Sequence, residues 1–217
     1  MTAHIYNKDI AEYSETAWHG KGHVHDGEFT PMEVIADFPQ FERRPTYVQH
    51  GMGLAQTGTD AIVRVDDPTE IMNPCVTARY GVPDYGWFDQ FCIEAIDAGA
   101  VEGFSTRGTL YNGRLAYASL KIGDDIWIGD GDRLENYLTL FDGTKGIACG
   151  GKNTVARVVC KNTWDAHLTG APVLFQEKHT TNVAERLEVA WRALLATVAA
   201  ERSLRQTVEQ LINESHH

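Results

Sequence analysis

Four cations and one tryptophan in the C-terminal third of the chain have the side chains needed to contact a nucleic-acid strand. Lysine and arginine neutralise backbone phosphates, and an aromatic ring can stack on an unpaired base. No Asp or Glu occurs between residues 143 and 164, so acidic neighbours along the chain do not cancel the local positive field. The predicted nucleic-acid-binding set is Lys145, Lys152, Arg157, Lys161 and Trp164.

The spacing of these residues predicts how they are positioned. Arg157, Lys161 and Trp164 fall one helical turn apart on a helix expected over Asn153–Leu168. The alternative interpretation is an amphipathic helix with a solvated face and a half-buried tryptophan. Lys145 and Lys152 lie on a Gly-rich connection, which is either a phosphate-holding loop ahead of the helix or a flexible hairpin loop.

The overall charge opposes nucleic-acid binding elsewhere on the chain. The formal net charge is -11, unlike that of a generally basic DNA-binding protein. Residues 1–144 carry 10 Lys and Arg against 23 Asp and Glu, whereas residues 145–217 carry 9 against 7. Any contact with a polyanion is therefore expected in the C-terminal third.

Two groups of histidine and cysteine residues contain side chains that can bind a metal. His19, His23 and His25 have no companion cysteine pair, and packing or hydrogen bonding is the commoner role of such histidines. The spacing of a second set is equally uninformative; it comprises Cys149, Cys160, His167 and His179. We expect no metal and no cofactor, and we read the four cysteines as reduced, mostly buried thiols.

The sequence contains no motif that clearly indicates an enzyme active site. Cys160 and His167 would share a helix face but lie roughly 10 Å apart along its axis, too far for direct activation. Acidic residues around 124–132 miss the spacing of an EF-hand and fit ordinary turns. No Walker pattern is present, which argues against a nucleotide triphosphatase. No catalytic residue is assigned, and a non-enzymatic protein is expected.

The elements that must position these residues indicate an α+β fold. Asn112-Gly113 between alternating runs predicts a hairpin of Phe104–Leu110 and Arg114–Lys121. Leu134–Phe141 is expected as a third strand and Ile147–Cys149 as a fourth, giving an antiparallel, curved meander packed with helices. Further strands are expected at Ala61–Val65, Cys75–Tyr80 and Leu174–Lys178.

Two further helices are expected around this meander. Asp84–Ala98 has apolar residues at helical spacing and Gly99 as a stop signal. Asn182–Asn213 begins with a capping box and carries an apolar seam through Trp191 and Leu194, which we expect to pack on another element or subunit. The expected organisation is an irregular arm (1–50) with a short helix at Pro31–Ala36, a core (51–180) and a helical segment (181–217).

Three stretches together resemble a family of phage and plasmid proteins catalogued as a domain of unknown function. They are AWHGKG at Ala17–Gly22, the Gly108–Arg114 hairpin with Phe141-Asp142-Gly143, and ARVVCKNT at Ala156–Thr163 followed by His179-Thr180. The resemblance spans about residues 17–195 and implies an origin in a mobile element; Lys161 and Trp164 depart from the family's pattern. It implies no activity.

The order helix, hairpin, third strand, helix is similar to the core of ring-forming single-strand annealing proteins, which hold DNA in a basic groove. This resemblance implies a homo-oligomeric, single-stranded DNA-binding or annealing protein acting in recombination or replication. The alternative is a phage accessory protein that binds a host protein or small ligand, which the charge of -11 favours. Without a signal peptide or long apolar run, a host-cytoplasmic protein with no membrane contact is expected; His216-His217 resembles a tag remnant and leaves the natural C-terminus open.

Overall fold

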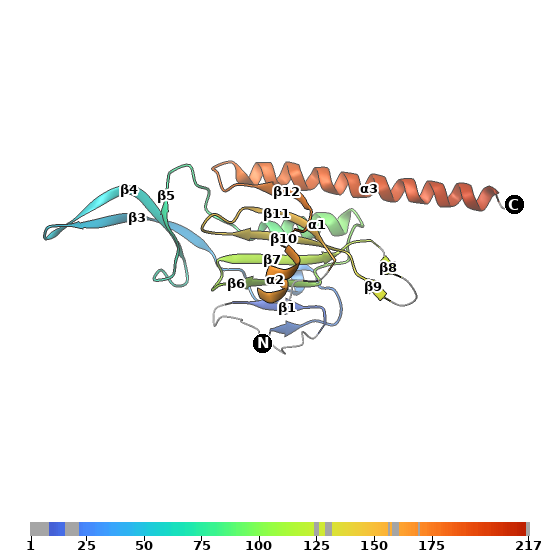
Figure 1. Ribbon diagram of the computed structural model, residues 1–217, viewed down its shortest axis with the longest axis horizontal. Coiled ribbons are helices and arrows are strands. Elements are labelled where there is room, and N and C mark those ends of the chain that lie inside the picture. The colour runs from blue at the N-terminus through green and yellow to red at the C-terminus, as the bar shows by residue number, and fades with distance from the viewer. Residues whose placement is uncertain are drawn as a thin grey trace.

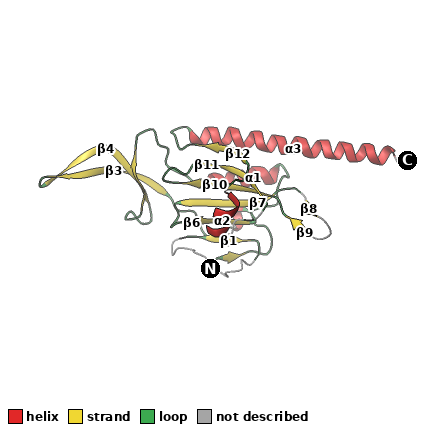
Figure 2. Ribbon diagram, viewed as in Figure 1, coloured by secondary structure: helices red, strands yellow, loops and turns green. Residues whose placement is uncertain are grey.

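The computed structural model describes residues 9–15, 22–123, 126–128, 132–155, 157, 161–168 and 170–215. These residues form an α+β structure in which helices pack against a large, mainly antiparallel sheet (Figures 1 and 2), and the predicted fold class is confirmed. A smaller three-stranded sheet projects from one end of the body (Figure 1). No helix in the described part of the chain is long and apolar enough to cross a membrane.

The main sheet has seven strands in the order β12-β11-β10-β7-β6-β1-β2. All neighbouring strands are antiparallel except the pair β1 and β2. The strands are β1 (Ala11–Tyr13), β2 (His23–Val24), β6 (Thr106–Leu110), β7 (Leu115–Lys121), β10 (Tyr137–Gly143), β11 (Cys149–Thr154) and β12 (Val173–Glu177).

The predicted hairpin is confirmed as β6 and β7. Its turn holds Tyr111, Asn112 and Gly113 at φ values of 60°, 59° and 83°, a left-handed conformation that Asn and Gly tolerate best. The prediction of the next strand was inexact, because β10 begins at Tyr137. The preceding residues form a separate two-stranded hairpin of β8 (Ile126–Ile128) and β9 (Asp132–Leu134).

Alternation along the central strands sends side chains into two different cores. Even-numbered residues of β7 and β10, such as Ala118 and Leu140, belong to the large core beneath α1 (Trp87–Asp97) and the first half of α3 (Val183–Ser215). Odd-numbered residues, such as Tyr117 and Phe141, form a second cluster with Trp164 of α2 (Lys161–Leu168). Thus α1 and α2 lie on opposite faces of the sheet (Figure 2).

The described residues among the first fifty are more regular than the irregular arm expected from their composition. Glu12 on β1 is fully buried in the main sheet, and β3 (Phe41–His50) pairs with β4 (Gly53–Arg64), which pairs with β5 (Ile71–Val76). The β3–β4 hairpin reaches away from the body (Figure 1) and exposes Met52 and Leu54 near its tip. The expected short helix is one 3-10 turn, η1 (Pro31–Glu33).

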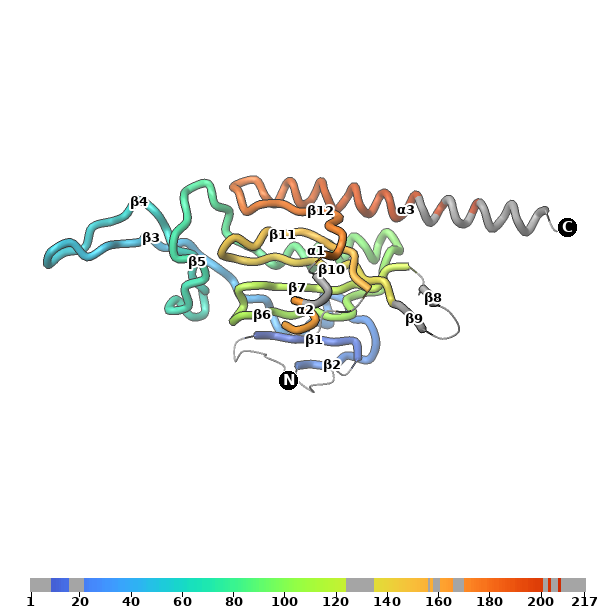
Figure 3. Tube along the Cα trace, in the orientation of Figure 1, coloured from blue at the N-terminus to red at the C-terminus, as the bar shows by residue number. Residues whose placement is uncertain are grey.

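The long helix α3 follows β12 after a short link, as the trace in Figure 3 shows. Leu187, Trp191 and Leu195 recur every four residues and are buried in the large core, whereas Leu194 is only partly buried. The predicted burial of Trp191 is confirmed, and the surface that covers it belongs to the same chain. Packing of this part of α3 therefore does not require a second subunit.

Trp191 joins α3 to α1 by three different contacts. Its ring stacks on Trp87 with centroids 5.9 Å apart and meets Phe91 edge-on at 6.3 Å. Its indole N–H donates a hydrogen bond of 2.9 Å to Glu94 Oε2. With 5% of its surface exposed, the side chain is a main attachment of α3 to the body.

Replacement of Trp191 by alanine is expected to lower the free energy of unfolding by about 3–5 kcal/mol, because a large buried ring and its contacts are removed. The control is Val189→Ala on the same helix; Val189 is 71% exposed, so the change should stay within about 0.5 kcal/mol. Urea unfolding followed by circular dichroism measures both. Equal, small effects would show that α3 is not held by this contact.

Gly113 is expected to resist substitution for a steric reason added to its backbone conformation. A Cβ atom there would lie 2.8 Å from Pro39 Cγ and 3.0 Å from Arg64 Nη1. Gly58 also has a positive φ, 78°, but nothing lies within 4 Å of its Cβ position. Gly58→Ala should therefore cost about 1 kcal/mol from the backbone conformation, and Gly113→Ala clearly more. Thermal unfolding of both variants tests this; a larger loss for Gly58→Ala would contradict it.

Candidate functional site

The prediction of a helix over Asn153–Leu168 was wrong at its start. Lys152 and Asn153 lie in β11, and helix α2 begins only at Lys161, so Arg157 precedes the helix that was expected to carry it. Sheet pairing overrides the helical spacing here, because β11 is hydrogen-bonded to both β10 and β12. The approach of β12 is close: a Cβ on Gly150 would lie 2.3 Å from the carbonyl oxygen of Phe175.

The structure nevertheless gathers three of the five predicted residues at one place on the sheet. Trp164 meets the Phe141 ring edge-on at 6.1 Å, and Lys152 Nζ lies 5.9 Å from the centre of the same ring. Lys161 Nζ lies 5.9 Å from the ring of Tyr111, which packs against the same cluster. We call this set of Tyr111, Phe141, Lys152, Lys161 and Trp164 the Phe141 corner.

The other two predicted residues stand apart from each other. Lys145 is exposed at the β10–β11 turn with a φ of 56°, two residues before Ile147, which packs against the Phe141 cluster. Arg157 instead contacts the end of β1. Its Nη1 donates 3.2 Å to Ser14 Oγ, and its Nη2 lies 3.7 Å from Glu15 Oε2. Arg157 is therefore directed away from the corner.

One acidic residue accompanies the cations of the corner. Lys161 forms an i,i+4 ion pair with Asp165, and this hydrogen bond raises the pKa of the lysine. An exposed pair of this kind contributes little to folding and can exchange its partner for a phosphate. The corner thus offers cations beside two aromatic rings, Tyr111 and Trp164, that are both partly exposed.

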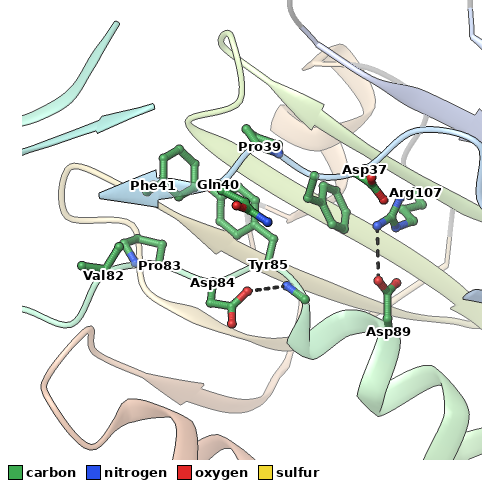
Figure 4. Close-up of a pocket in the computed structure, with 12 residues that line it drawn as sticks. Asp37, Pro39, Gln40, Phe41, Val82, Pro83, Asp84, Tyr85, Asp89 and Arg107 are labelled. Atoms are coloured by element: carbon green, nitrogen blue, oxygen red, sulfur yellow. Dashed lines mark hydrogen bonds and ion pairs between the residues drawn. The ribbon is translucent and has the colours of Figure 1, made fainter. Parts of the chain in front are cut away.

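A second candidate is a cavity of about 520 Å³ between the start of β3, the loop before α1, and β6 (Figure 4). Three carboxylates line it together with one guanidinium: Asp37, Asp84, Asp89 and Arg107. Aromatic side chains, including Tyr85 and Phe41, form its apolar wall. The excess of negative charge suits a small cationic ligand better than an anion.

Arg107 in this cavity is a buried structural cation. Its guanidinium stacks on Phe38 at 3.7 Å, and its Nη1 donates 2.8 Å to the carbonyl oxygen of Ala36. Nη1 lies 3.5 Å from Glu12 Oε1 and Nη2 lies 3.4 Å from Asp89 Oδ2 (Figure 4). Burial lowers the pKa of Arg107 and raises that of Asp89, while the opposite charge acts against both shifts.

A third group lies wholly inside the large core. The ligand-type atoms of Asp142 on β10, Cys149 on β11 and His179 after β12 all lie within 4.8 Å of one another. Burial raises the pKa of both Asp142 and the Cys149 thiol. The arrangement does not suit nucleophilic catalysis, because that reaction needs an accessible thiolate.

The remaining predicted groups do not assemble in the described part of the chain. His25 Nε2 donates a hydrogen bond of 2.9 Å to Glu12 Oε2, and its ring stacks on Phe29 at 4.0 Å. His23 is exposed on β2, while His19 and Cys160 lie outside the described residues. Cys75 is exposed and not buried as expected, because it occupies an outward position on the edge strand β5. Cys92 and Cys149 are buried, as predicted.

Sequence reasoning missed Arg107 and Asp142. The signal for both was a charged residue inside an otherwise uncharged strand, TRGTL for Arg107 and YLTLFDG for Asp142. A charged side chain in a strand buried on both faces must meet a partner of opposite charge, or its pKa shifts until the group is neutral. Which partner it meets depends on residues far away in the chain, such as Glu12 and His179.

Replacing Arg107 by methionine should lower the free energy of unfolding by about 3–5 kcal/mol, because Glu12 stays buried without its guanidinium. The double change Glu12→Gln/Arg107→Met should cost less than the two single changes together, and a double-mutant cycle measured in urea gives this coupling. Arg44→Met is the control, since its ion pair with Glu42 is exposed. Additive single effects would contradict the buried pair.

Comparisons with known proteins identify a family for this sequence but no relative of known activity. A family described as a domain of unknown function (DUF932) matches residues 75–216, well over half of the chain. The match contains every strand from β6 to β12 and all three α-helices. No curated protein and no solved structure matches the chain.

Proposed function

The chain belongs to the DUF932 family, a domain of unknown function, and we propose that it binds single-stranded DNA at the Phe141 corner. The observation that carries the proposal is the convergence of Lys152, Lys161 and Trp164 on one aromatic cluster. Cations beside partly exposed aromatic rings match the two needs of single-strand binding, phosphate neutralisation and base stacking. The proposed role is non-enzymatic.

The acidic remainder of the protein supports a restricted contact. With a net charge of -11, most of the surface repels a polyanion, so binding is confined to the segment without Asp or Glu between residues 143 and 164. Lys145 at the neighbouring turn extends the same positive segment. Such a contact can hold a short single strand but not wrap a duplex around the protein.

The wider setting is part of the same proposal. The resemblance to phage and plasmid proteins, and to ring-forming annealing proteins, favours a role in recombination or replication of a mobile element in the host cytoplasm. Self-association accompanies this role, since annealing proteins work as assemblies. The apolar seam of α3 does not itself support self-association, because its residues up to Leu195 pack within one chain.

The acidic cavity supports a second candidate, binding of a small cationic ligand. Asp89 is a cavity-lining carboxylate whose Oδ1 has no hydrogen-bond partner among the described residues. Its raised pKa shows that the single guanidinium of Arg107 does not fully compensate its burial. A primary amine in the cavity would place a positive charge beside the partly exposed Asp89 carboxylate. This candidate corresponds to the accessory-protein alternative.

The triple variant Lys145→Gln/Lys152→Gln/Lys161→Gln is expected to weaken binding of a labelled oligothymidine. It should also reduce the slope of log affinity against log salt by about 2, since each single-strand phosphate contact contributes about 0.7. Trp164→Leu should weaken binding by a further stacking contribution of about 1–3 kcal/mol if a base lies on the ring. Fluorescence anisotropy across a salt series measures both.

The matched control is Arg44→Gln/Arg79→Gln/Lys178→Gln, which removes the same charge from exposed residues outside the corner. Circular dichroism establishes that each variant is folded, and mass photometry with and without DNA gives the assembly state. Equal loss in both triple variants, or no binding by the unmodified protein at low salt, would overturn the proposal and leave the small-ligand candidate.

A further inference from the structure

Three side chains with different metal-ligating atoms meet in the large core. Asp142, Cys149 and His179 are 2%, 0% and 8% exposed, and their ligand atoms lie within 4.8 Å of one another. Asp142 lies on β10, Cys149 lies on the neighbouring strand β11, and His179 lies in the link from β12 to α3. Asp142 and Cys149 flank the β10–β11 turn, and strand pairing aligns their side chains on the same face.

Their polar atoms are only partly satisfied by the protein itself. His179 Nε2 and Asp142 Oδ1 form a buried ion pair at 3.1 Å, although the contact lacks the alignment of a full hydrogen bond. Among the described residues, neither ring nitrogen of His179 has a hydrogen-bond partner, and Asp142 Oδ1 has none either. Buried polar atoms rarely stay unsatisfied without a reason, and a bound ion is one of the recognised reasons.

A neighbouring side chain holds Asp142 in the way that metal-ligating carboxylates are commonly held. The other oxygen of Asp142, Oδ2, accepts a hydrogen bond of 2.8 Å from the indole N–H of Trp87. A ligating carboxylate is commonly held in this way by a donor on its second oxygen, which fixes the first toward the ion. The Cys149 thiol donates a hydrogen bond of 3.3 Å to the carbonyl oxygen of Glu177, so this oxygen lies beside the cluster.

We propose that Asp142, Cys149 and His179 form a buried site for a zinc ion. A thiolate, an imidazole and a carboxylate together suit Zn²⁺, whereas Mg²⁺ and Ca²⁺ prefer oxygen ligands alone. Tetrahedral zinc at its usual bond lengths sets ligand atoms about 3.4–3.6 Å apart. A pair of atoms at the 4.8 Å limit of the cluster would therefore have to approach by roughly 1 Å when the ion binds. On binding, Cys149 releases its thiol proton to solvent and ligates as thiolate.

The ion would add a coordination link between elements that packing and hydrogen bonds already join. It would join the β10–β11 hairpin to the start of α3, and through Asp142 and Trp87 it would reach α1. Its role is therefore structural, which fits a site without an exposed ligand. It would strengthen the same junction that Trp87 and Trp191 form by stacking.

The test uses the full chain, freed of metal by a chelator and titrated with Co²⁺ as a spectroscopic substitute for Zn²⁺. The expected result is one ion per chain, with intense visible bands typical of tetrahedral cobalt and a thiolate-to-cobalt charge-transfer band. That band distinguishes this site from histidines alone, such as those near the chain end. Zn²⁺ should displace the cobalt and raise the melting temperature.

Cys149→Ser should abolish the charge-transfer band and His179→Gln should weaken binding, whereas Cys92→Ser, at a buried thiol on α1, should leave the spectrum unchanged. If the Cys149 or His179 variants do not fold, zinc-edge X-ray absorption of the unmodified protein decides the question. One sulfur with nitrogen and oxygen neighbours supports the site. No sulfur, several sulfurs, or no binding by folded protein overturns it.

Discussion

The structure depends on a central antiparallel sheet that is covered on both faces. Because strand side chains alternate, each residue of β7, β10 and β11 is assigned to one of two cores by its parity alone. Asp142 and Cys149 therefore face α1 and α3, while Phe141 and Lys152 face α2. A register shift of one residue would exchange the two sets, placing Lys152 in the large core and Asp142 and Cys149 on the α2 face.

The register is set locally, which explains why the sequence predicts this part well. The turn at Tyr111–Gly113 requires three left-handed residues, and Asn and Gly supply two of them. Helix α1 is bounded by apolar spacing and by Gly99, whose φ of 65° ends it. Likewise α3 carries its own repeating seam through Leu187 and Trp191. Each of these signals lies within one element.

Elements that depend on distant partners were not predictable in the same way. The residues that follow Asn153 have apolar side chains at helical spacing in the sequence. In the structure, however, the backbone N–H of Asn153 donates a hydrogen bond of 3.1 Å to the carbonyl oxygen of Pro172, so Asn153 extends a strand. Glu12 lies in a segment without strand periodicity, yet β1 pairs with β6 and places it beside Arg107. The sequence singled out Lys152, Lys161 and Trp164 of the Phe141 corner, but Lys152 lies on a strand and only Lys161 and Trp164 lie on α2.

The two faces of the sheet also separate two kinds of chemistry. On the α2 face, charged groups remain near water, where an ion pair such as Lys161–Asp165 can open at little cost and a phosphate can take its place. On the α1 face, Asp142 and His179 are buried, so a charge there must be neutralised by something equally fixed. Reversible contact with a polyanion is consequently suited to the first face and permanent coordination to the second. Since β10 supplies both Phe141 and Asp142, a shift in the position of this one strand would affect both faces at once.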